Sequence, residues 1–277
     1  MKRASKFVRE MYAAWCSHRG GALAAELLLF AVLSALPLLL SLTALLGSAS
    51  TLIGDRGAEE FRIWVLNQTS KVIGADSPGL TVVEQLFATS AKKAVTLGAV
   101  FALYAASRAF ISMVGSLDVI YGTSAGRSWV GQRVLGVVLT LVSMVMLPAV
   151  LVAMYAGRRI SVNLVGDGMW RGVVGAGLWC LGFALAVVWL AGLFRYIPKR
   201  PGRFVQQLPG AVAAVTLIWA WTELFRWYLW IFNANAVFGA LGAAISLMWW
   251  GYFCASSFFL GAELNQWISQ RSKALAA

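Results

Sequence analysis

Residues 235–265 read NAVFGALGAAISLMWWGYFCASSFFLGAELN, and the part from Ala236 to Ala262 carries no charged side chain. An α-helix rises about 1.5 Å per residue, so an uncharged helix of this length exceeds the roughly 30 Å hydrocarbon core of a bilayer. We therefore predict that 236–262 spans a membrane. Gly239 and Gly242 lie among alanines spaced four residues apart, which predicts a face on which another helix can pack closely.

The composition of the whole chain is that of an integral membrane protein. Of its 277 residues, 60% are hydrophobic and only 12% are charged, and the mean hydropathy is +0.75. Soluble domains carry about 25% charged residues. We attribute the net charge of +12 to the cytoplasmic side of a membrane protein rather than to a specific nucleic-acid partner. The three cysteines are scattered and histidine occurs once, so we expect neither a metal site nor a cofactor.

Further apolar stretches predict an all-α, polytopic bundle of six transmembrane helices with amphipathic interfacial helices. The predicted spans are 21–48, 94–121, 130–155, 171–194, 208–232 and 236–262, which together form a transmembrane domain over 21–268. Pro37 and Pro148 should kink the first and third spans.

The segments between and beyond the spans are predicted from charge and spacing. The basic segment 1–20 has apolar residues four apart, which predicts an amphipathic helix on the inner leaflet. Residues 49–92 are predicted to form an extracytoplasmic loop with short helices, and 269–277 a cytoplasmic tail. If both termini are cytoplasmic, the inner segments hold thirteen basic residues and the short outer loops hold three. The positive-inside rule therefore favours six spans in a bacterial inner membrane with both ends in the cytoplasm.

Several ionisable residues fall within or beside the predicted spans, where a charge costs about 3 kcal/mol or more. The candidates for a cavity or transport pathway are Glu26, Arg108, Glu223, Arg226, Glu263 and Asn265. We predict that Glu26, Arg108 and Glu263 converge on an inward-facing polar cavity. Glu223 and Arg226 are three residues apart, so they either pair within one helix or line the opposite mouth. The alternative is that all these charges form static ion pairs that lock the bundle.

A short basic elbow is predicted between the fourth and fifth spans, near anionic head groups. Its candidates for lipid contact are Arg195, Lys199, Arg200 and Arg203. Motifs of common enzymes are absent from the sequence: there is no GxxxxGK[ST], GxSxG or HExxH. We therefore expect no enzyme activity.

Some of these stretches are similar to a known family. Asn235-Ala-Val-Phe-Gly239, Leu241-Gly242, the Trp249-Trp250 region and Leu260-Gly-Ala-Glu-Leu-Asn265 closely resemble the last helix of the YihY/BrkB family of bacterial inner-membrane proteins. Ser34-Ala-Leu-Pro37-Leu-Leu resembles its first helix. The resemblance implies a six-helix inner-membrane protein, for which export of lipids or other amphiphiles and movement of small osmolytes have been proposed. Members also carry a historical ribonuclease label, but this sequence lacks the clustered carboxylates or the histidine pair that RNA cleavage would use.

Three functions remain open from the sequence. The first is a flippase-like exporter of lipids or amphiphiles, which small-residue faces, a basic inner surface and the lack of an ATP site favour. The second is an ion- or proton-coupled carrier of small solutes, in which Glu26, Glu223 or Glu263 titrates. The third is an envelope scaffold that transports nothing. A cavity open sideways to lipid would favour the first, an enclosed water-filled cavity the second and a dry bundle the third.

Overall fold

The computed structural model describes residues 2–33, 63, 92–123, 128–151, 169–198, 203–232 and 234–276. These residues are almost entirely helical: α1 (Lys2–Ser17), α4 (Lys92–Ile120), α5 (Trp129–Leu151), α7 (Met169–Tyr196), α8 (Phe204–Phe232) and α9 (Ala234–Ala276). A further helix covers Gly20–Leu33 and meets α1 at a bend of 57°. No strand occurs within these ranges, which confirms the all-α prediction for the described part of the chain.

Four of the described helices are long and apolar enough to cross a membrane. The qualifying windows are Trp129–Leu147 in α5, Val173–Tyr196 in α7, Phe204–Leu229 in α8 and Ile245–Ser272 in α9. The bent pair at the N-terminus would make a fifth if it forms one span. Helix α4 occupies the predicted span 94–121 with 29 residues, but it is not among the four. The described residues therefore support a multi-pass membrane protein with four or five candidate spans, and six spans stay a prediction.

The ends of α8 and α9 differ from the predicted spans. Helix α8 begins at Phe204, four residues before the predicted start, because Gln206 caps its first turn. The Oε1 atom of Gln206 accepts a hydrogen bond from the Arg203 backbone N–H at 3.0 Å, and the Gln206 backbone N–H donates to Arg203 O at 2.9 Å. Helix α9 continues to Ala276, so the segment predicted as a tail after residue 268 is helical as far as residue 276. The apolar window of α9 lies nearer the C-terminus than the predicted span 236–262.

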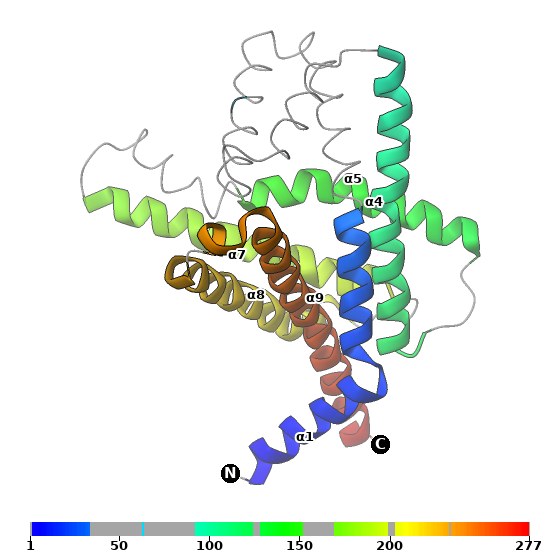
Figure 1. Ribbon diagram of the computed structural model, residues 1–277. Helices are drawn as coiled ribbons and strands as arrows, with labels where there is room; N and C mark the ends of the chain where they lie inside the picture. Colours follow the sequence, from blue (N-terminus) through cyan, green and yellow to red (C-terminus); the bar gives the residue numbers. More distant parts are fainter. Residues whose placement is uncertain are drawn as a thin grey trace.

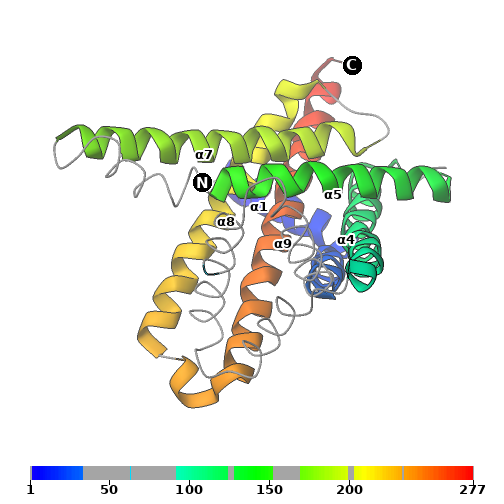
Figure 2. The same ribbon diagram turned by 90° about the horizontal axis from the view of Figure 1, so that it is seen from above.

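Helices α8 and α9 lie side by side and form the most extensive helix contact in the described part of the structure (Figure 2). Helix α7 packs on α8, α5 packs on α4, and both α1 and α4 contact α9. The start of α1 and the end of α9 lie at the same end of the molecule, the lower end in Figure 1. The described core is formed where these helices meet, with Leu117, Phe194 and Phe259 fully buried.

Several predicted features lie outside the described residues, namely Pro37, the helices of the 49–92 loop, Lys199 and Arg200. Helix α5 continues past Pro148 to Leu151, and α9 includes Gly239 and Gly242, of which Gly242 is buried.

Candidate functional site

A buried polar network joins α4, α8 and α9 at the end of the molecule that holds both termini. The Asn265 carboxamide bridges the first turns of α8: its Nδ2 donates to Gln207 O at 3.1 Å, and its Oδ1 accepts from the Gly210 N–H at 2.8 Å. The Tyr121 hydroxyl donates to Gln207 Oε1 at 2.9 Å. Pro209 explains the bridge, since a proline inside a helix has no N–H and disturbs the backbone ladder around it. The Asn265 side chain supplies hydrogen-bond partners to the backbone groups of Gln207 and Gly210, on either side of this proline.

The bridge depends on a very close approach of two glycines. A Cβ atom built on Gly210 would lie 2.0 Å from Gly261 O, and one built on Gly261 would lie 2.4 Å from Gly210 O. Any side chain at either position would therefore push α8 and α9 apart. The small-residue face predicted around Gly239 and Gly242 stays a prediction, since the close approach that the described residues show is at Gly261, beyond that stretch.

A second polar contact links α1 to α9 through a nearly buried carboxylate. His18 Nδ1 lies 2.6 Å from Glu263 Oε1, and the side chains are 30% and 2% exposed. His18 follows α1 directly, and the next residue, Arg19, has a left-handed backbone with φ of 54°. This conformation is uncommon for a residue other than glycine and turns the chain from α1 into the Gly20–Leu33 helix. The turn places the imidazole against α9.

A polar cavity of about 430 Å³ lies beside this contact, between α1 and the C-terminal part of α9. Its lining residues are Glu10, Ala13, Ala14, His18, Glu263, Gln266, Trp267, Gln270 and Arg271. Glu10 holds the two helices together, because Oε2 accepts from Trp267 Nε1 at 2.9 Å and lies 3.4 Å from Arg271 Nη2. The hydrogen bond from Trp267 and, to a smaller extent, the charge of Arg271 lower the pKa of Glu10. Phe7 packs edge-on against Trp267, with ring centroids 4.9 Å apart.

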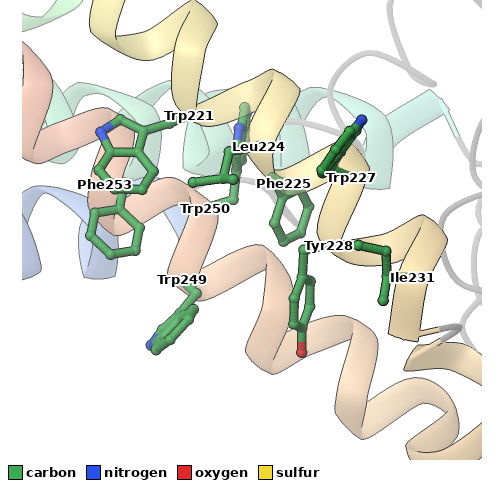
Figure 3. Close-up of a pocket in the computed structure, with 9 residues that line it drawn as sticks. All are labelled: Trp221, Leu224, Phe225, Trp227, Tyr228, Ile231, Trp249, Trp250 and Phe253. Atoms are coloured by element: carbon green, nitrogen blue, oxygen red, sulfur yellow. The ribbon is translucent and has the colours of Figure 1, made fainter.

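An apolar groove of about 330 Å³ lies between α8 and α9, further from the termini (Figure 3). Seven of its nine lining residues are aromatic; the set is Trp221, Leu224, Phe225, Trp227, Tyr228, Ile231, Trp249, Trp250 and Phe253. Trp221 stacks on Phe253 at 4.2 Å, and Trp250 Nε1 donates to Thr222 Oγ1 at 3.1 Å. Most of the groove falls within the apolar windows of both helices.

The structure places Glu26 and Arg108 on two helices that face each other. Glu26 Oε1 accepts from Ser112 Oγ at 3.0 Å, and the Arg108 guanidinium lies 5.1 Å from the ring centre of Phe30. Both side chains are exposed, and no carboxylate of the described residues forms an ion pair with Arg108. Glu263 does not join them, since its partner is His18.

Glu223 and Arg226 pair with each other within α8. Arg226 Nη1 lies 2.9 Å from both carboxylate oxygens of Glu223, and neither residue lines the polar cavity or the apolar groove. Of the two arrangements predicted for these residues, the structure has the ion pair within one helix. At the elbow, the guanidinium of Arg195 lies 5.6 Å from the ring centre of Tyr196, and Arg203 is exposed at the start of α8.

Sequence reasoning missed several residues that the structure places in polar contacts, and four of them show why. His18, Tyr121 and Gln207 stand at helix ends, where polar residues are expected and give no signal. Arg133 lies on α5, where its Nη1 donates to Ser107 Oγ at 3.1 Å and its guanidinium lies 4.1 Å from the ring centre of Tyr104. Its position inside a predicted span is the signal that could have identified it.

Comparison with known proteins agrees with the pattern of the last helix. The sequence profile of the family described as Virulence factor BrkB matches residues 11–277. The chain belongs to this family. A BrkB-family relative from Bacillus subtilis (strain 168), YfkH, is named as ribonuclease-like and is 26% identical over 275 residues, which is 96% of each chain. No solved structure matches. The matched range contains His18, Glu263, Asn265, the whole lining of the apolar groove and the lining of the polar cavity except Glu10.

Proposed function

We propose that this BrkB-family protein moves a lipid or another amphiphilic molecule across the membrane, as a flippase-like exporter. One observation supports this most strongly: α9 contributes to a polar cavity near the termini and to an apolar groove further along the same helix. A molecule with a polar head and an apolar chain needs both environments. A small hydrophilic solute would gain little from a groove lined by seven aromatic side chains.

The geometry of α9 supports the use of both sites by one molecule. Trp249 lines the groove and Trp267 lines the cavity. They are eighteen residues apart, which is about five turns at 3.6 residues per turn, so they lie on the same side of the helix. At about 1.5 Å per residue they are roughly 27 Å apart, close to the thickness of a hydrocarbon core. Tryptophan is enriched at both membrane interfaces, so the two sites fit opposite leaflets.

Reconstitution of the full-length protein into liposomes with fluorescent phospholipids tests the proposal. We expect the protein to increase the rate at which labelled lipid in the inner leaflet becomes accessible to an outside quencher. Replacing Leu224 with Trp should slow this exchange about tenfold, as a rise of ~1.4 kcal/mol in the barrier would, because the larger side chain fills the groove.

The matched control is Leu229→Trp. Leu229 is also an exposed leucine of α8, but it does not line the groove. This variant should exchange lipid at the rate of the unmodified protein. Lipid exchange equal to that of protein-free liposomes, or equal slowing by both variants, would contradict the proposal.

A second candidate function, a proton-coupled carrier of small solutes, is favoured by the contact between His18 and Glu263. Imidazole and carboxylate groups can both bind a proton, and carboxylates and histidines within membrane spans occur in the proton relays of transporters. Uptake of labelled osmolytes into the same liposomes, driven by a pH gradient and without lipid exchange, would select this candidate. We do not propose RNA cleavage on the strength of the name given to YfkH, because the polar cavity contains one histidine and lies within helices of membrane-spanning character.

A further inference from the structure

We propose that the cavity between α1 and α9 binds the primary ammonium group of an amphiphile, with Glu263 as the carboxylate that receives it. The inference deepens the proposed function and rests on it, because it names the chemical class of the head group that the protein would handle. The binding site itself can be tested without transport.

The two carboxylates that line the cavity differ in their counter-charges: Glu10 has Arg271 and also Lys6 (Nζ–Oε1 3.9 Å), whereas Glu263 has only His18 among the described ion pairs. Two carboxylates enter from different helices, Glu10 from α1 and Glu263 from α9. Arg271 is the one arginine or lysine among the nine lining residues, and it is already engaged: it pairs with Glu10 at 3.4 Å and its guanidinium lies 4.1 Å from the ring centre of Trp267. Glu263 is therefore left with a histidine, whose positive charge depends on a proton.

The burial of Glu263 makes a cationic ligand favourable. The residue is 2% exposed, and a buried carboxylate without a counter-charge is strongly destabilising. A ligand cation that enters the cavity supplies this counter-charge. Among the ion pairs of the described residues, Glu263 has none with a residue of α4 or α8.

The other lining groups favour a primary ammonium over other cations. An ammonium group has three N–H donors, and Glu263, Gln266 and Gln270 offer acceptor oxygens around the cavity. A quaternary ammonium has no N–H donor and is recognised by aromatic faces, but the face of Trp267 is occupied by Arg271. A bare metal ion fits poorly, because the described residues contain no group of three or more metal-binding side chains. The volume of about 430 Å³ is that of a site for a small organic group.

Binding titrations on the purified full-length protein in detergent test the proposal. The probes are phosphatidylethanolamine, phosphatidylcholine with the same acyl chains, phosphatidylglycerol and water-soluble phosphoethanolamine. Phosphatidylethanolamine should bind at least about tenfold more tightly than phosphatidylcholine, because a quaternary ammonium has no N–H group to donate to the carboxylate. Equal affinity for these two lipids in the unmodified protein would overturn the proposal whether or not any variant folds.

The variant E263Q should lose the preference for phosphatidylethanolamine. The control E223Q should keep it, since Glu223 pairs with Arg226 away from the cavity. A preference that survives in folded E263Q would also refute the site. Displacement of the lipid by phosphoethanolamine would show that the head group alone is the ligand, and failure to displace it would assign the site to the intact lipid. A clear preference without any lipid exchange in liposomes would retain the site and refute the transport function.

Discussion

Gly210 and Gly261 are the two residues that control how closely α8 and α9 approach. We predict that Gly261→Ala destabilises the protein by about 1–3 kcal/mol, the usual cost of overpacking a close contact. The added methyl would meet Gly210 O at 2.4 Å and the Cβ of Ala214 at 2.8 Å, and both are fixed by their helix. The measurement is the apparent melting temperature of the purified protein in detergent.

Gly115→Ala is the control for that substitution. Gly115 is also inside a helix, but a Cβ atom there would meet nothing within 4 Å. Alanine favours a helix over glycine by about 1 kcal/mol, so this variant should melt at the same or a higher temperature. Equal melting temperatures for Gly261→Ala and the unmodified protein would show that α8 and α9 do not pack through these glycines.

At the residue scale, the sequence singles out polar groups at the end of a span but does not identify their partners. Glu263 and Asn265 are conspicuous because they end a long uncharged stretch. Their partners cannot be derived in the same way, because His18 and Gln207 are 245 and 58 positions away in the chain. Helical spacing relates residues on one helix and says nothing about which helix faces it. The partners therefore required the structure.

Helix α1 is attached to α9 through a small set of side chains, of which Glu10, His18 and Phe7 make the identified contacts. We predict that Trp267→Phe loosens this attachment while leaving the rest of the protein intact. The phenyl ring can still meet Phe7, but the N–H donor to Glu10 is lost. Amide hydrogen exchange in residues 2–17 should become faster at neutral pH, and exchange in α8 should not change.

The effect of acid on the same attachment follows from the lowered pKa of Glu10. A carboxyl group whose pKa is lower in the folded state stabilises that state above its ordinary pKa, and the stabilisation is lost as the pH falls through the lowered value. Exchange in residues 2–17 should therefore increase when the pH falls below the ordinary range of glutamate, after correction for the intrinsic exchange rate. Unchanged protection in both Trp267→Phe and acid would show that Glu10 does not hold α1.

At the element scale, apolar runs identified the helices, but they did not set the helix ends. The start of α8 at Phe204 depends on the Gln206 cap, a local hydrogen bond that an average over many residues does not detect. Helix α9 continues past the predicted span 236–262 to Ala276, and in this part Trp267 packs on Phe7 and donates to Glu10 of α1. Hydropathy predicts contact with lipid and is silent about such interfaces.

At the scale of the whole molecule, segments predicted to share the cytoplasmic side are close together in space. The end of α4 meets the start of α8 through Tyr121 and Gln207, and the end of α1 meets α9 through His18 and Glu263. The charge count predicted a common side for these segments without using any distance. Which side of the membrane this end of the molecule faces stays a prediction, and it decides from which side a ligand would reach the polar cavity.

Reporter fusions test the sidedness of this arrangement. A fluorescent protein that folds only in the cytoplasm should be fluorescent when fused before Met1 or after Ala277, and alkaline phosphatase should be active when inserted within 49–92. An even number of crossings requires both termini to give the same result. Opposite results at the two ends would mean an odd number of spans. Since His18 and Glu263 are 2.6 Å apart and lie close to the opposite termini of the chain, such a result would also contradict the packing of α1 on α9 and remove the polar cavity.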